Sequence, residues 1–114
     1  MDLLHRLADW VARPQRQQLV NQLTSLSLEK VWRRVAHRVP AMRPAVARGY
    51  IRARAIHIVE RHAETLSWQH PRLQRTGGAE IRNAALEQVV DRLSARAVRL
   101  AAQQGPVAPA RRAA

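Results

Sequence analysis

Apolar residues recur at intervals of three or four along most of the chain, and no stretch alternates apolar and polar residues as a half-buried strand would. This spacing places apolar side chains along one side of a helix, which has about 3.6 residues per turn. Residues 28–39 form the cleanest amphipathic segment, and in residues 79–103 the apolar residues follow the 4-3-4-3 spacing of a heptad seam. The seam consists of Leu86, Val90, Leu93, Ala97 and Leu100. We therefore expect an all-α fold.

Prolines and serines divide the chain into the expected helices. We predict helices over residues 2–12, 14–25, 28–39, 44–67 and 79–103. Pro14 and Pro44 suit the first turn of a helix, where the missing N–H costs nothing. Ser25 and Ser27 can cap the third helix. The pattern predicts a bundle of four to five helices.

The length of 114 residues is typical of a single domain, which we place at residues 1–103. Residues 104–114 lack periodicity and contain two prolines and two arginines, so we expect a disordered basic tail. The N-terminus has no apolar signal-peptide core, and no run approaches the roughly 18 apolar residues of a membrane-spanning helix. Because the chain also lacks cysteine, we expect a cytoplasmic protein.

The charge is strongly basic, with 20 Lys and Arg against 8 Asp and Glu. No acidic residue lies between Glu29 and Glu60. That window contains Lys30, Arg33, Arg34, Arg38, Arg43, Arg48, Arg52 and Arg54. A surface of this kind attracts polyanions. We expect these eight side chains to contact the phosphates of DNA or RNA with little sequence discrimination.

Aromatic residues are few, because the chain has no Phe and one Tyr. Trp10 and Trp32 share the helical phase of neighbouring Leu and Val residues, so we expect both to be buried. We interpret the tryptophans, Trp68 included, as structural. Without displayed aromatics, phosphate contacts are favoured over base stacking.

The main alternative is a protein-interaction or dimerisation module. The seam could pair two copies of the chain through the five residues named above. Acidic residues flank the seam on one side and arginines on the other, which suits a specific helix partner. Binding to a membrane surface is less favoured, because the apolar residues of the basic helix are needed for the core.

No catalytic set, cofactor motif or metal site is expected. The serines lack evident His and acid partners, so we do not expect an enzyme. His57, Glu60 and Glu64 are spaced i, i+3 and i+7, but an ordinary charged helix surface supplies the same residues. Gly77 and Gly78 open a helix without the spacing of a phosphate-binding glycine motif.

Overall fold

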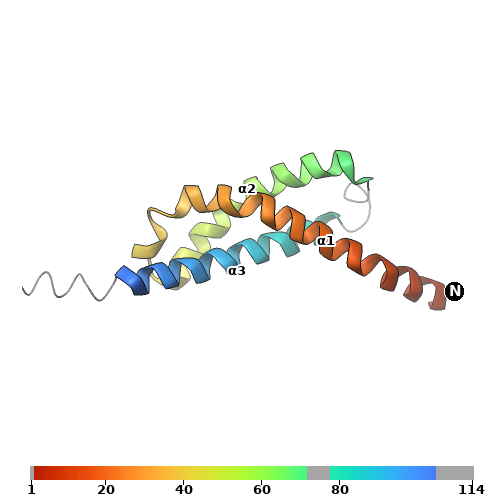
Figure 1. Cartoon of the computed structure of the whole chain (residues 1–114), viewed down its shortest axis with the longest axis horizontal. Coiled ribbons are helices and arrows are strands. Elements are labelled where there is room, and N and C mark those ends of the chain that lie inside the picture. Colours follow the sequence, from red (N-terminus) through yellow and green to blue (C-terminus); the bar gives the residue numbers. More distant parts are fainter. Residues whose placement is uncertain (1, 72–77, 105–114) are drawn as a thin grey trace, which may run out of the picture.

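A computed structural model shows three long α-helices that run up, down and up along one another (Figure 1). The elements are α1 (Asp2–Val35), the short 3₁₀ helix η1 (Val39–Ala41), α2 (Pro44–Gln69) and α3 (Gly78–Gln104). The structure describes residues 2–71 and 78–104, with side chains described from residue 14 onward. These ranges contain no strand, and the predicted all-α fold is confirmed.

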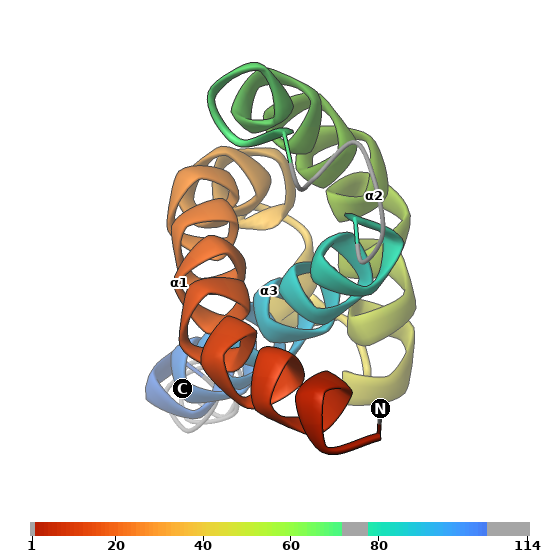
Figure 2. The same cartoon turned by 90° about the vertical axis from the view of Figure 1, so that its right-hand side faces the viewer.

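Each helix buries a row of residues spaced mainly four apart. The rows are Leu19, Leu23, Ser27, Val31 and Val35 on α1, Ala47, Ile51, Ala55, Val59, Ala63 and Leu66 on α2, and Ile81, Ala85, Val89, Leu93 and Ala97 on α3. Viewed end-on, α1 and α2 lie on either side of α3, and the rows meet in one core (Figure 2). On α2 an alanine alternates with a larger aliphatic residue. The neighbouring helices can approach closely at each alanine, and side chains interdigitate at each larger residue.

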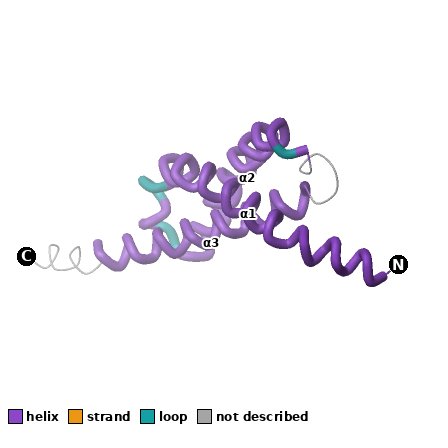
Figure 3. Tube along the Cα trace, turned by 45° about the vertical axis from the view of Figure 1, so that its right-hand side comes forward, coloured by secondary structure: helices purple, strands orange, loops and turns teal. Residues whose placement is uncertain are grey.

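α1 is one continuous helix where three helices were predicted (Figure 3). Pro14 lies inside it, although its ring nitrogen cannot donate a hydrogen bond to the preceding turn. Ser27 is not a cap; it is fully buried, and its hydroxyl donates to the carbonyl of Leu23 at 2.8 Å. The small Ser27 side chain keeps the buried row unbroken across the predicted boundary, so packing favours continuity. The described residues thus form three α-helices rather than four to five.

The predicted boundaries of α2 and α3 are accurate to within two residues. α2 begins at Pro44, as predicted, and ends at Gln69 rather than at residue 67. α3 exceeds the predicted 79–103 by one residue at each end. Between α1 and α2 the chain turns through η1, which buries Val39 in the core.

The predicted burial of Trp32 is confirmed, since 9% of this residue is exposed. The side chain of Trp10 and residues 105–114 of the predicted tail lie outside the described parts of the chain.

The heptad seam of α3 is used mainly within the bundle. Val90, Leu93 and Ala97 are buried, and Leu86 and Leu100 pack partly buried against the same core. Little of the seam remains for a second copy of the chain.

Candidate anion-binding groove

A groove lies between the last turns of α1 and the middle of α2. Its volume is about 470 Å³, and it is lined by Lys30, Arg33, Arg34, Ile58, Arg61, His62 and Thr65. A hollow of about 160 Å³ shares three of these residues and adds Arg54 and His57. We call the two together the basic groove. No carboxylate among the described residues lines either part.

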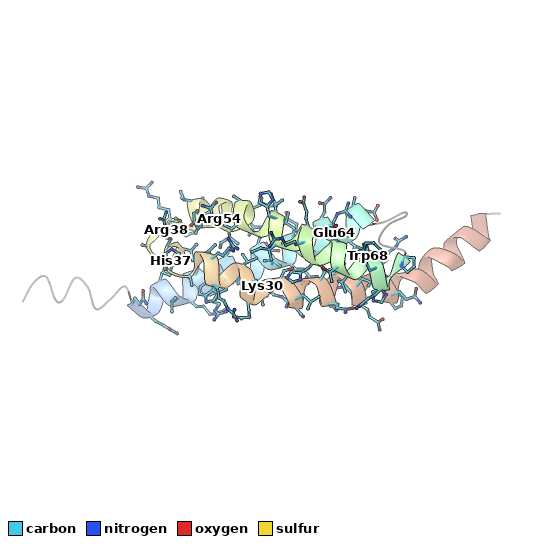
Figure 4. All side chains as sticks on the ribbon, turned by 90° about the horizontal axis from the view of Figure 1, so that it is seen from above. Lys30, His37, Arg38, Arg54, Glu64 and Trp68 are labelled. Carbon is cyan, nitrogen blue, oxygen red and sulfur yellow. The ribbon has the colours of Figure 1, made fainter. Side chains whose placement is uncertain are left out.

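The periodicity of the two helices places these cations. On α1 the core row leaves Arg33 and Arg34 exposed. On α2 Arg54 and Arg61 lie seven residues apart, outside the buried row and on the side that meets α1. Figure 4 looks onto this face, with Lys30 on α1 and Arg54 on α2. The basic groove is therefore assembled from two helices that turn their cationic sides toward one another.

None of the lysine and arginine side chains of the basic groove forms an ion pair within the described part of the chain. The pKa of His62 responds to this excess of positive charge. Burial, and then the charges of Lys30 and Arg61, lower the pKa of His62 below its usual range. An anion in the groove would offset those charges and favour the protonated imidazole. The electrostatics of the site thus favour a negatively charged ligand.

Arg48 and Arg52, two of the eight predicted nucleic-acid contacts, face α3 and pair with its acids. Arg48 Nη2 lies 2.6 Å from an Asp91 oxygen and 3.6 Å from a Glu87 oxygen. Arg52 donates two hydrogen bonds to the Glu87 carboxylate, one of them at 3.0 Å. The hydrogen bond from Arg52 is the main cause that lowers the pKa of Glu87. The acid-free window of the sequence is therefore partly neutralised by a distant helix.

The other predicted cations divide between the basic groove and the corner near η1. Lys30, Arg33, Arg34 and Arg54 lie at the groove. The Arg54 guanidinium carbon lies 4.5 Å from the centre of the Tyr50 ring, a contact that orients it without occupying its N–H donors. Arg38 and Arg43 precede η1 and α2 as exposed N-cap residues outside the groove lining.

Three ionisable residues of the groove were not in the predicted set: His57, Arg61 and His62. Part of the signal was present, because Arg54, His57 and Arg61 are spaced i, i+3 and i+7 on the side of α2 away from the core. The prediction relied on a window without acids, which ends at Glu60, just before Arg61. Following the helical phase past Glu60 would have added Arg61 to the predicted set.

Trp68 contradicts the interpretation of all tryptophans as structural, because it is 80% exposed. The buried row of α2 continues through Val59, Ala63 and Leu66, and Trp68 falls outside its phase. An aromatic ring is thus displayed near the end of the helix that carries Arg54 and Arg61.

A separate hollow of about 580 Å³ lies between α1 and α3, and both acidic and basic side chains line it. It is lined by Leu28, Asp91, Arg92, Leu93, Ala95, Arg96 and Arg99. Arg96 pairs with Glu29 at 3.1 Å, and its guanidinium carbon lies 4.3 Å from the centre of the Trp32 ring. Carboxylates therefore reach this hollow, unlike the basic groove.

Comparisons with protein-family models, curated proteins and solved structures find no match. Within the described residues, no helix combines the length and hydrophobicity needed to cross a membrane. The same residues include no cluster of three His, Asp or Glu side chains placed to hold a metal ion. A functional interpretation must therefore start from the geometry and charge of the basic groove.

Proposed function

We propose that the protein binds nucleic acid through phosphate contacts in the basic groove. The observation that carries this proposal is the meeting of cations from two helices without a described carboxylate between them. Lys30, Arg33 and Arg34 supply one rim, and Arg54 and Arg61 supply the other. Like charges held this close repel one another, and a bound polyanion relieves that repulsion.

The extent of the basic groove suits a polymer better than a single phosphate. With a rise of 1.5 Å per residue, Lys30 and Arg34 are about 6 Å apart along α1, and Arg54 and Arg61 about 10 Å apart along α2. Along the axis of a duplex each strand carries a phosphate about every 3.4 Å, so several phosphates can meet these cations. Contacts to phosphate carry no sequence information, and we expect weak discrimination among sequences.

A protein-interaction or dimerisation module has less support, because the bundle covers most of the seam that would carry it. Both DNA and RNA fit the proposal. We place this activity in the cytoplasm as part of the same proposal, since a chain without cysteine suits a reducing compartment.

The test measures affinity as a function of salt. If five groove cations each neutralise one phosphate, log K should fall against log[salt] with a slope of about −4.5 for a duplex or −3.5 for a single strand. The triple variant Arg33→Gln, Arg34→Gln, Arg61→Gln should reduce that slope in magnitude by about 2 to 3.

A matched control separates the groove from net charge. Arg16, Arg92 and Arg99 are exposed and lie outside the basic groove, so replacing all three with Gln removes the same charge elsewhere. The control should keep most of the parental slope. Equal loss in both triple variants would show general charge attraction, and no loss in the groove variant would refute the proposal.

A further inference from the structure

The exposed ring of Trp68 has no role in the core. At 80% exposed it is the most exposed large hydrophobic side chain among the described residues, ahead of Val46 at 57%. It takes part in neither of the ring contacts with arginine found in the described structure, which involve Tyr50 and Trp32. With 80% of the residue exposed, most of the indole is available to a planar ligand.

Trp68 continues the line of arginines on α2. Arg54, Arg61 and Trp68 are spaced at intervals of seven, which drifts by only about 20° around a helix per interval. Each interval covers about 10 Å along the axis. Thr65, which lines the groove, lies one turn before Trp68. Figure 4 shows Arg54 and Trp68 along α2 and Lys30 on α1, all on the face in view. A polyanion that leaves the groove past Arg61 thus passes over the indole.

The acidic neighbour of Trp68 lies on the side away from the groove. Glu64 is exposed and precedes Trp68 by four residues, which places it about 40° further around α2. Arg61 lies about 20° from Trp68 in the opposite sense. This arrangement repels phosphates on the outer side of the ring and attracts them on the groove side.

We infer that the basic groove takes single-stranded nucleic acid, with phosphates held by the groove cations and an unpaired base stacked on Trp68. This inference rests on the proposed function and adds the class of nucleic acid. Proteins that bind single strands combine a cationic groove with aromatic side chains, because every base offers a π-face. The bases of a duplex stack on one another inside the helix, and their faces cannot reach a side chain on a rigid α-helix.

The test compares Trp68→Ala and Trp68→Phe with the parent on three probes of equal length: oligothymidylate, an abasic oligonucleotide and a duplex. Base stacking on an aromatic residue contributes enough that Trp68→Ala should weaken oligothymidylate binding by about 5- to 150-fold. The abasic and duplex probes present phosphates without accessible bases, so their affinities should not change. Trp68→Phe should keep most of the affinity for oligothymidylate, and oligouridylate should follow the same pattern.

Fluorescence supplies an independent readout. Oligothymidylate should quench a component of tryptophan emission in the parent, and Trp68→Ala should lack that component. The abasic probe should quench neither protein. Because Trp68 is exposed, the alanine variant should unfold at the parental denaturant concentration, and this control excludes a folding defect.

Failure of this inference differs from failure of the proposed function. If Trp68→Ala binds oligothymidylate like the parent while the groove triple variant loses binding, stacking is refuted and phosphate binding stands. If the groove triple variant binds every probe like the parent, both are refuted. Competition by polyglutamate equal to that by oligothymidylate would also overturn both, because the groove would then suit an acidic protein.

Discussion

The arginines of α2 make two different kinds of contact, although they lie on one helix. Arg48 and Arg52 reach the acids of α3, where Glu87 contacts both. Arg54 and Arg61 turn toward α1 and meet further cations instead. The direction in which an arginine projects from the helix thus determines whether it pairs with an acid of another helix or remains available for a ligand.

The tryptophans differ in the same way. Trp32 is buried in the core, and Arg96 covers its ring on the α3 side of the bundle. Trp68 is exposed, one helical turn after Thr65 of the basic groove. On the α3 side Arg48, Arg52 and Arg96 pair with carboxylates, whereas no described carboxylate pairs with the cations of the basic groove. This difference supports the groove side as the proposed binding face.

The two tryptophans give the largest expected contrast. Replacing Trp32 with Ala removes a buried ring and should lower the free energy of unfolding by about 3–5 kcal/mol. Replacing Trp68 with Ala should change it by no more than about 0.5 kcal/mol, the usual limit for a surface site. Urea unfolding curves measure both values. Similar losses in the two variants would mean that Trp68 packs against part of the fold.

Substitution of their acidic partners would make Arg48 and Arg52 unpaired, like the arginines of the basic groove. The double variant Glu87→Gln, Asp91→Asn removes the partners of Arg48 and Arg52 and frees two cations. The salt slope of nucleic-acid binding should become steeper by up to about 2, because each added phosphate contact contributes about 0.9. The control Glu60→Gln, Glu80→Gln neutralises two exposed carboxylates that pair with no described arginine. An equal effect in the control would show that ion pairing does not distinguish the two sets of arginines.

Gly49 offers a change in stability without a change in charge. It lies inside α2, and a Cβ atom added there would meet nothing within 4 Å. Gly49→Ala should raise the free energy of unfolding by about 0.5–1 kcal/mol through reduced entropy of the unfolded chain. Nucleic-acid affinity should stay at the parental value. A thermal melt and a binding curve on the same sample test both parts, and a lower melting temperature would contradict the open environment of Gly49.

His62 should give the smallest effect, because it is only half-buried. Its pKa is lowered in the folded protein, so the unfolded chain binds more protons near and below its usual value of about 6.5. Stability should therefore fall as the pH drops from about 6.5 toward the pKa of folded His62. A polyanion in the groove reverses the local charge, so affinity should rise over the same pH range.

His62→Gln should flatten both pH profiles, and His57→Gln serves as the control for a neighbouring imidazole. The charged groups near His62 in the groove are Lys30, Arg33 and Arg34 from α1 and Arg61 from α2. The difference between the profiles of the parent and His62→Gln can therefore be assigned to the imidazole of His62. Unchanged profiles in His62→Gln would refute this assignment.

The sequence alone determined the helical class, the extents of α2 and α3 and the burial of Trp32. Each depends on local information: the spacing of apolar residues, a proline at the start of α2 and the Gly77-Gly78 pair at the predicted start of the last helix. The sequence also placed Lys30, Arg33, Arg34 and Arg54 outside the core. Helical phase was sufficient for these residues, because it separates an inward from an outward side without reference to any partner.

The tertiary structure determined which of the residues outside the core face another helix, and which helix they face. Local rules predicted breaks at Pro14 and Ser27. At Ser27 the buried row from Leu19 to Val35 outweighs the predicted break through packing against two helices. The ion pairs of Arg48 with Asp91 and of Arg52 with Glu87 join residues 43 and 35 positions apart. Such contacts depend on the register between helices, which is set by the complementary shapes of the buried rows and not by the local sequence of any one helix.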